Sequence, residues 1–160
     1  MLGIVDLIFK EVVDKGYTEY VKNKEFKTHV KAIKERLKLE LRLNIEIISA
    51  FFPEANYKES VAPHEFSKAF NAIRTSAFSS LSDGVIPLSE IFSEKIENKI
   101  FYESNQKYKE WCSNDKHLYQ LIERTYLKLE VTKAYTDFSE SKIDIGYLKF
   151  LILSCIKALK

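Results

Sequence analysis

The longest stretch without a helix breaker runs from residue 18 to residue 52. Gly16 precedes it, Pro53 follows it, and neither glycine nor proline occurs between them. Thr18 can cap a helix at the start of this stretch, and Gly16 stands where a cap glycine ends an earlier helix. One helix over 18–52 would span about 50 Å, which exceeds the diameter of about 40 Å expected for a compact chain of this size. The sequence therefore predicts a long helix that projects, bends, or lies along an elongated body.

Residues 37–48 test this prediction, because their apolar and polar side chains alternate. Such alternation is typical of a β-strand. The alternating residues, however, are mostly leucine and isoleucine beside lysine, glutamate and arginine, a composition that favours a helix. No turn residue separates them from the helical pattern before them. The nearest candidate strand partner, residues 142–147, is short, and an isolated strand pair is marginal. We therefore predict a helix.

A helix over these residues carries two apolar stripes on nearly opposite sides. The first stripe comprises Leu37, Leu41, Ile45, Ile48 and Phe52 and continues the face of Phe26, Val30 and Ile33. The second stripe comprises Leu39, Leu43, Ile47 and Phe51. A helix that is apolar on two sides has to be covered on two sides. Either it is the central helix of its own domain, which is the usual meaning of an apolar stripe, or the second stripe is an interface with another chain. In both cases we expect Leu39, Leu43 and Ile47 to be buried in the assembled protein.

The rest of the chain predicts five further helices, because apolar residues recur at helical spacing between few breakers. We expect these helices over about 2–15, from Pro63 to the turn at 82–84, from Pro87 to about Cys112, after the caps at 113–115, and from 139–141 to Leu159. No repeat or low-complexity segment interrupts them. The predicted fold is an all-α bundle of about six helices, built around the long helix, in one domain over residues 1–160.

Composition places the chain among soluble globular proteins. It has 160 residues, 46% of them hydrophobic and 30% charged, with a net charge of +2. This charge alone is too small to indicate a nucleic-acid or membrane partner. Two cysteines make no disulfide framework, and the first 15 residues lack the basic start of a signal peptide. The longest apolar tract, residues 145–159, is too short to span a bilayer. We therefore expect a cytoplasmic protein that does not associate with membranes.

One charge pattern distinguishes the first half of the long helix. Six cations, called the basic stripe below, recur every three or four residues: Lys24, Lys27, Lys31, Lys34, Lys38 and Arg42. Like charges four residues apart repel by a few tenths of a kcal/mol, so local helix stability does not favour this arrangement. The stripe predicts either a surface for nucleic-acid phosphates or an acidic partner, or an ordinary solvated face in a lysine-rich protein.

Residues 107–119 interleave aromatic side chains with lysines. Tyr108, Trp111 and Tyr119 alternate there with Lys107, Lys109 and Lys116. This combination can stack bases and hold phosphates, but a helix end that packs its aromatic rings against a neighbouring helix has the same pattern.

No catalytic or metal-binding signature is present. The three histidines, His29, His64 and His117, lack the partner ligands that a zinc or di-iron site requires. Cys112 and His117 could form a nucleophile and its base, but nothing near them suggests an oxyanion site. The four isolated glycines form no phosphate-binding loop. We therefore expect no cofactor, no metal and no small-molecule ligand.

These observations favour a non-enzymatic helical protein-interaction module that self-associates or serves as a subunit of a larger assembly. Its partner would be another protein or a second copy of the chain. The first alternative is a nucleic-acid-binding protein that uses the basic helix face at residues 24–42. The second is a helical enzyme without a recognisable motif.

Overall fold

The fold is all-α, as the sequence predicts. A computed structural model describes residues 3–16, 19, 24–51, 68, 71–96, 105–112, 115–134 and 144–160. Over these residues the helices are α1 (Ile4–Lys15), α3 (Lys24–Phe51), α5 (Ser76–Ser82), α6 (Leu88–Ile91), α8 (Gln106–Cys112), α9 (Leu118–Ala134) and α10 (Ile145–Ala158). No strand occurs in this part of the chain. None of these helices is long and apolar enough to cross a membrane.

Helix α3 is the longest of these elements, with 28 residues and a length of about 42 Å. It contains all of residues 37–48, so their alternation belongs to a helix. Gly16, after α1, has a φ of 78°, the left-handed conformation expected of a cap glycine. The predicted start of the long helix at residue 18 lies outside the described residues.

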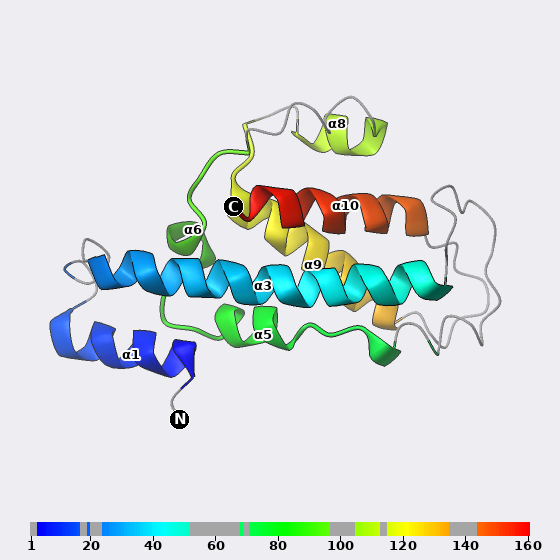
Figure 1. Cartoon of the computed structure of the whole chain (residues 1–160). Helices are drawn as coiled ribbons and strands as arrows, with labels where there is room; N and C mark the ends of the chain where they lie inside the picture. Colours follow the sequence, from blue (N-terminus) through cyan, green and yellow to red (C-terminus); the bar gives the residue numbers. More distant parts are fainter. Residues whose placement is uncertain are drawn as a thin grey trace.

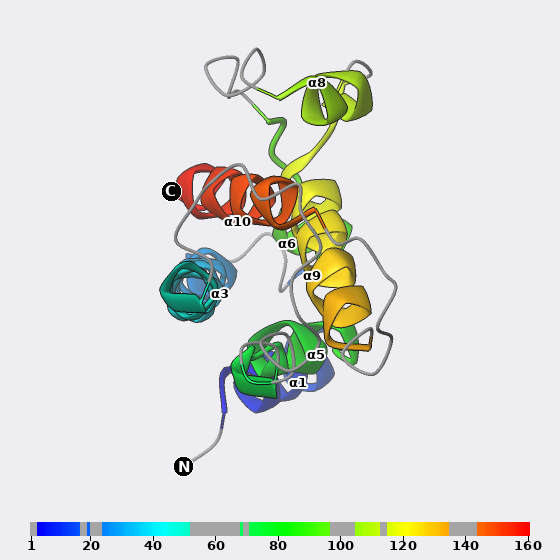
Figure 2. The same ribbon diagram turned by 90° about the vertical axis from the view of Figure 1, so that its right-hand side faces the viewer.

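Helices α1, α5, α9 and α10 lie around α3 on three sides. In Figure 1, α10 runs along one side of α3, while α1 and α5 lie on the opposite side. Figure 2 looks along α3 and shows α9 crossing a third side. The first apolar stripe faces this core, since Leu37, Leu41 and Ile48 are fully buried. Fully buried residues of α9 and α10, among them Leu121, Leu129, Leu151 and Ile152, complete it.

The helix predicted from Pro87 to Cys112 is wrong, because α6 ends at Ile91. The backbone of the next residues bonds to the segment before α9 instead of continuing a helix. Tyr119 N donates to Phe92 O at 3.1 Å, Leu118 N to Glu94 O at 2.7 Å, and Ile96 N to Lys116 O at 3.0 Å. A separate helix, α8, then spans Gln106–Cys112.

Two further helix boundaries differ from the expectation. Residues 73–75 are not helical, so the helix predicted from Pro63 to the turn at 82–84 is interrupted before α5. Helix α10 begins at Ile145, because Asp144 caps it by accepting a hydrogen bond from Tyr147 N at 2.9 Å, while the predicted start at 139–141 lies outside the described residues.

A cluster of buried polar groups fixes α3 to its neighbours. The buried Glu40 carboxylate accepts hydrogen bonds from Ala77 N at 2.9 Å, Ser76 Oγ at 3.2 Å and Tyr126 Oη at 2.9 Å. One turn later, fully buried Asn44 brackets the backbone of Arg74: it donates to the carbonyl at 2.7 Å and accepts from the amide at 2.9 Å. We call Glu40 and Asn44 the polar clamp. It joins α3 to the start of α5 and, through Tyr126, to α9.

Glu40→Ala should lower the free energy of unfolding by about 3 kcal/mol, because it leaves two buried donors, Ala77 N and Tyr126 Oη, without an acceptor and also removes the bond from Ser76. Tyr126→Phe removes one of these bonds and should cost about 1 kcal/mol. Urea unfolding followed by circular dichroism measures both. Glu35→Ala, at an exposed position of the same helix, is the control and should change stability by about 0.5 kcal/mol or less. An equally small effect of Glu40→Ala would contradict the structural role of the clamp.

Candidate functional site

The second apolar stripe is largely exposed in the chain by itself. Leu39 is 69% exposed, Leu43 39% and Phe51 43%, while Ile47 is half-buried. The central-helix interpretation, in which Leu39 and Leu43 are buried within a single chain, is therefore wrong. In Figure 2, no described helix lies on the side of α3 that faces away from α9, so α3 is not covered on every side. Burial of the stripe in an assembly stays a prediction.

Exposed charges border this stripe. Arg42 and Glu46 are one turn apart and both are exposed. On a helix they lie on the same flank of the stripe, about 40° from each other. Neither forms an ion pair within the described part of the chain, so both charges are available to a partner.

Two of the six cations of the basic stripe are paired with carboxylates. Lys34 forms an ion pair with Glu94, and Lys38 bonds Glu35 at 3.0 Å. The Lys38 ammonium, through this bond and its charge, holds the pKa of Glu35 below its usual value. The four remaining cations are exposed and have no ion-pair partner among the residues described: Lys24, Lys27, Lys31 and Arg42.

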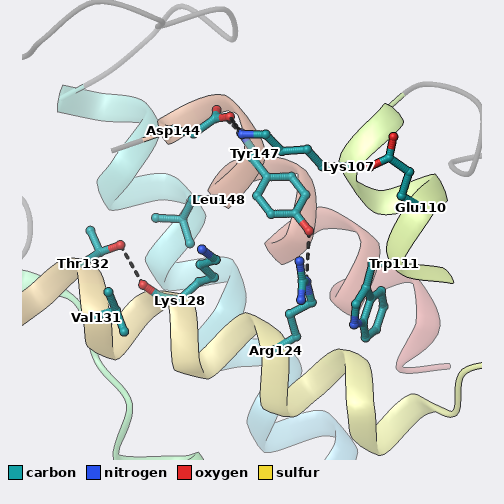
Figure 3. Close-up of a pocket in the computed structure, with 10 residues that line it drawn as sticks. All are labelled: Lys107, Glu110, Trp111, Arg124, Lys128, Val131, Thr132, Asp144, Tyr147 and Leu148. Carbon is teal, nitrogen blue, oxygen red and sulfur yellow. Dashed lines mark hydrogen bonds and ion pairs between the residues drawn. The ribbon is translucent and has the colours of Figure 1, made fainter. Parts of the chain in front are cut away.

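A cavity of about 620 Å³ opens between α8, α9 and α10 (Figure 3). Three cations, two carboxylates, two aromatic rings and three smaller side chains line it: Lys107, Arg124, Lys128, Glu110, Asp144, Trp111, Tyr147, Val131, Thr132 and Leu148. Its volume lies within the range of small-molecule binding sites. The sequence predicts no small-molecule ligand because it contains no recognised binding motif. The residues that line this cavity do not form such a motif either.

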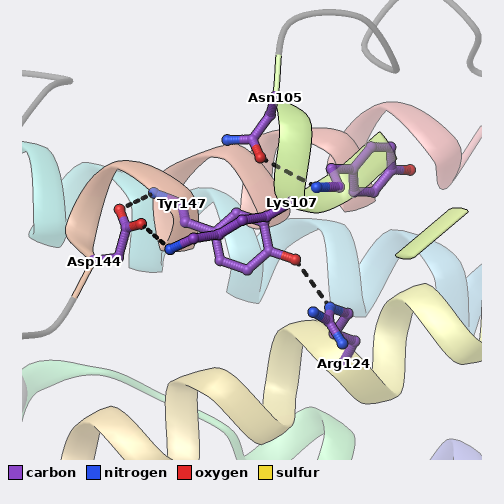
Figure 4. A network of polar contacts seen from close by, with 6 residues as sticks. Asn105, Lys107, Arg124, Asp144 and Tyr147 are labelled. Carbon is purple, nitrogen blue, oxygen red and sulfur yellow. Dashed lines mark hydrogen bonds and ion pairs between the residues drawn. The ribbon is translucent and has the colours of Figure 1, made fainter. Parts of the chain in front are cut away.

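Arg124 is the most tightly positioned cation of the cavity. Its Nε donates to Tyr147 Oη at 3.0 Å, and its guanidinium carbon lies 5.0 Å from the centroid of the Trp111 ring and 5.8 Å from that of Tyr147. Figure 4 shows Arg124 reaching from α9 to the hydroxyl of Tyr147 on α10. Two rings and one hydrogen bond therefore orient the guanidinium, and its terminal Nη groups are not used in these contacts.

The charge of Lys107, on the other side of the Tyr147 ring, is neutralised by a carboxylate. Its Nζ lies 2.6 Å from Asp144 Oδ2 and 5.4 Å from the centroid of the Tyr147 ring. Asp144 is also the cap of α10, so this ion pair ties α8 to the first turn of α10 (Figure 4). Lys128, by contrast, is exposed and has no ion-pair partner among the described residues.

Within the segment 107–119, some described residues lie in the core and others line the cavity. Tyr108 packs in the core, where its ring meets Phe150 edge-on with centroids 5.1 Å apart. Trp111 and Lys107 line the cavity instead. Sequence reasoning missed Arg124, Lys128 and Tyr147. The two cations stand four residues apart on α9, and such a like-charge pair is a weak signal that could have drawn attention to them.

The two cysteines lie in surroundings that suppress reactivity. Burial raises the pKa of Cys155 to about 12 and also raises the pKa of Cys112. A thiol must ionise to act as a nucleophile, so neither cysteine is activated. Among the described residues, no three metal-ligating side chains gather in one place.

Comparison of the chain with protein-family models, with curated proteins and with solved structures finds no significant match, so function has to be inferred from its own residues.

Proposed function

We propose that the protein is a non-enzymatic helical module that self-associates through the second apolar stripe of α3. The observation that carries this proposal is the exposure of Leu39, Leu43 and Phe51 on one face of a helix whose opposite face is buried. Apolar side chains that gather on one exposed face are typical of an interaction site. Burial of such a side chain contributes about 1.5–3 kcal/mol, which the isolated chain leaves unused here.

The spacing of the stripe supports a second copy of the chain as the partner. In an antiparallel pair with its two-fold axis at residue 44, position i of one helix lies opposite position 88 minus i of the other. Leu39 then fits between Ile47 and Phe51 of the second copy, and Leu43 fits between its Leu43 and Ile47. Each side chain of the stripe thus enters a gap of the same stripe, as in knobs-into-holes packing. The stripe is self-complementary in this register.

The flanking charges support the same register. Position 42 lies opposite position 46, so Arg42 meets Glu46 of the second copy. A two-fold axis keeps the same flank of both helices on the same side, so this ion pair forms twice. Over the described overlap, residues 37–51, no other exposed charge faces the second copy, because Lys38 lies on the opposite side of the helix and Glu40 is buried in the polar clamp. The apolar spacing and the charges are independent observations, and both indicate this one arrangement.

Leu43→Asp should give a folded monomer. The side chain is exposed in the single chain, so a charge there leaves the fold intact but places two carboxylates at the centre of the dimer. Sedimentation velocity measures the mass and circular dichroism the melting temperature. Leu127→Asp is the matched control, since Leu127 is 64% exposed on α9, and it should leave the dimer unchanged. Unfolding by Leu43→Asp would contradict the exposure of the stripe, and an unaltered dimer mass would contradict its role.

Arg42→Glu should weaken the dimer about tenfold, since two modest ion pairs become two repulsions. Glu46→Arg should do the same, whereas the double variant R42E/E46R should recover the wild-type dissociation constant. A mixture of the two single variants should form heterodimers, because each glutamate of one variant then faces an arginine of the other. Analytical ultracentrifugation over a concentration series measures this, with Lys27→Glu, outside the overlap, as control. Failure of both the double variant and the mixture to recover would reject the antiparallel register.

Nucleic-acid binding is a second candidate function, favoured by the four free cations of the basic stripe: Lys24, Lys27, Lys31 and Arg42. Phosphate contacts through lysine give affinity without base recognition, so binding would be non-specific. The compensation of Lys34 and Lys38 by carboxylates reduces the number of available contacts from six to four.

Four phosphate contacts should give a log–log salt slope of about −4 on duplex and about −3 on single strands. Lys27→Glu with Lys31→Glu should remove this binding and change stability by about 0.5 kcal/mol or less. Fluorescence anisotropy with a labelled oligonucleotide at several salt concentrations measures the slope. The control exchanges Lys10 and Lys109, exposed lysines of α1 and α8, for glutamate. Absence of binding to either form at low salt would reject this candidate.

A further inference from the structure

We propose that the cavity between α8, α9 and α10 binds a small phosphate monoester, with Arg124 and Lys128 holding the phosphate. This site is separate from the second apolar stripe of α3, and the inference does not depend on the proposed self-association. Figure 3 shows Arg124 and Lys128 rising from α9 toward α10 at the cavity. Charge, preorganisation and volume each support this assignment.

The three cations and two carboxylates of the cavity lining leave it with a net charge of +1. The carboxylate of Glu110 accepts a hydrogen bond from Gln106 Nε2 at 3.0 Å. Lys107 and Asp144 neutralise each other at 2.6 Å, which removes one cation and one carboxylate from the lining. Arg124 and Lys128 have no carboxylate within ion-pair distance in the described structure. They lie one turn apart on α9, where two like charges repel and do not help the helix. Two adjacent cations facing a cavity favour an anionic ligand such as a phosphate.

The guanidinium of Arg124 is already oriented in the chain without such a ligand. Trp111 and Tyr147 hold the guanidinium plane, and the Nε–Tyr147 hydrogen bond of 3.0 Å fixes its rotation. Because the side chain is oriented before binding, less side-chain entropy is lost when the ligand binds. The terminal Nη groups can then donate two parallel hydrogen bonds to phosphate oxygens, while Lys128 contributes a mobile point charge. This combination of a fixed fork and a point charge suits phosphate better than a single carboxylate.

The size of the cavity indicates that the ligand is more than an inorganic ion. A volume of about 620 Å³ is far larger than one phosphate needs and fits a small organic molecule. Leu148 and the rings of Trp111 and Tyr147 provide apolar surface for the organic part. A phosphate monoester that carries a ring or a short carbon skeleton therefore matches both halves of the lining.

The chain carries its own reporter for this test. Trp111 is the only tryptophan of the protein and lines the cavity, so its fluorescence should respond to a ligand beside Arg124. Phenyl phosphate is the probe. Benzoate has the ring with a single charge, and inorganic phosphate has the charge without the ring. Titration of the full chain, followed by fluorescence and by calorimetry, compares the three ligands.

We expect saturable binding of phenyl phosphate with a dissociation constant of about 1 mM or lower, and at least about tenfold weaker binding of benzoate and of inorganic phosphate. No saturable signal up to about 10 mM would overturn the proposal. If benzoate bound as tightly as phenyl phosphate, the site would not be specific for the phosphate group. If inorganic phosphate bound as tightly, the site would not recognise the organic part of the ligand. Binding of an oligonucleotide without a terminal phosphate, but not of phenyl phosphate, would assign the site to nucleic acid instead.

Arg124→Gln and Lys128→Gln should each weaken phenyl phosphate binding about tenfold or more, since each removes a charged donor. Arg124→Gln also loses its contacts with two rings, so Lys128→Gln, at an exposed side chain, is the variant that leaves the fold intact. Lys109→Gln, on α8 but outside the cavity lining, is the matched control and should bind as the wild type does. Unchanged affinity in Lys128→Gln with an unchanged melting temperature would overturn the assignment.

Discussion

The polar clamp of Glu40 and Asn44 determines how α3 is rotated in the fold. A buried carboxylate requires hydrogen-bond donors, and the three donors to Glu40 come from the start of α5 and from α9. Burial raises the pKa of Tyr126, and the nearby Glu40 carboxylate raises it further, so the hydroxyl stays protonated and donates. Asn44 adds two bonds to the backbone of Arg74. Because these groups can point in only one direction, the opposite side of α3 is turned outward.

This rotation explains why one of two similar apolar stripes is buried and the other is exposed. Leu37, Leu41 and Ile48 lie on one side of the clamp and are buried in the core that α3 forms with α10 and the neighbouring helices. Leu39 and Leu43 lie across the clamp from them and stay exposed. Hydrophobicity alone would bury either stripe equally well. The buried polar groups between the stripes decide which of them faces the core, since a wrong rotation would leave the donors of Ser76, Ala77 and Tyr126 without an acceptor.

Local sequence is sufficient for the helices but not for their relations in space. Composition and the absence of breakers identify residues 37–48 as helix, and Gly16 marks a helix end. The break after Ile91 escapes such reasoning because it depends on backbone bonds to residues 116–119, which are distant in the sequence. Periodicity places Glu40 and Asn44 in one polar seam between the stripes, but it cannot show that the seam is buried.

The cavity escapes sequence reasoning for a related reason. Trp111, Arg124 and Tyr147 come from three helices, and no spacing within the chain connects them. Only the packing of α8 and α10 on α9 brings two rings to one guanidinium.

The core of the single chain does not include the second apolar stripe, and this limits how strong self-association can be. The core formed by α3, α9 and α10 is complete without the second stripe, since its central side chains are fully buried. The dimer contact would therefore add to a folded monomer and would not create the fold. About four apolar side chains per copy could contribute several kcal/mol, but association costs about 4–15 kcal/mol in lost freedom. Two flanking ion pairs add at most about 2 kcal/mol. These opposing magnitudes indicate a weak, concentration-dependent dimer, in which the charges select the register and the apolar side chains supply the affinity.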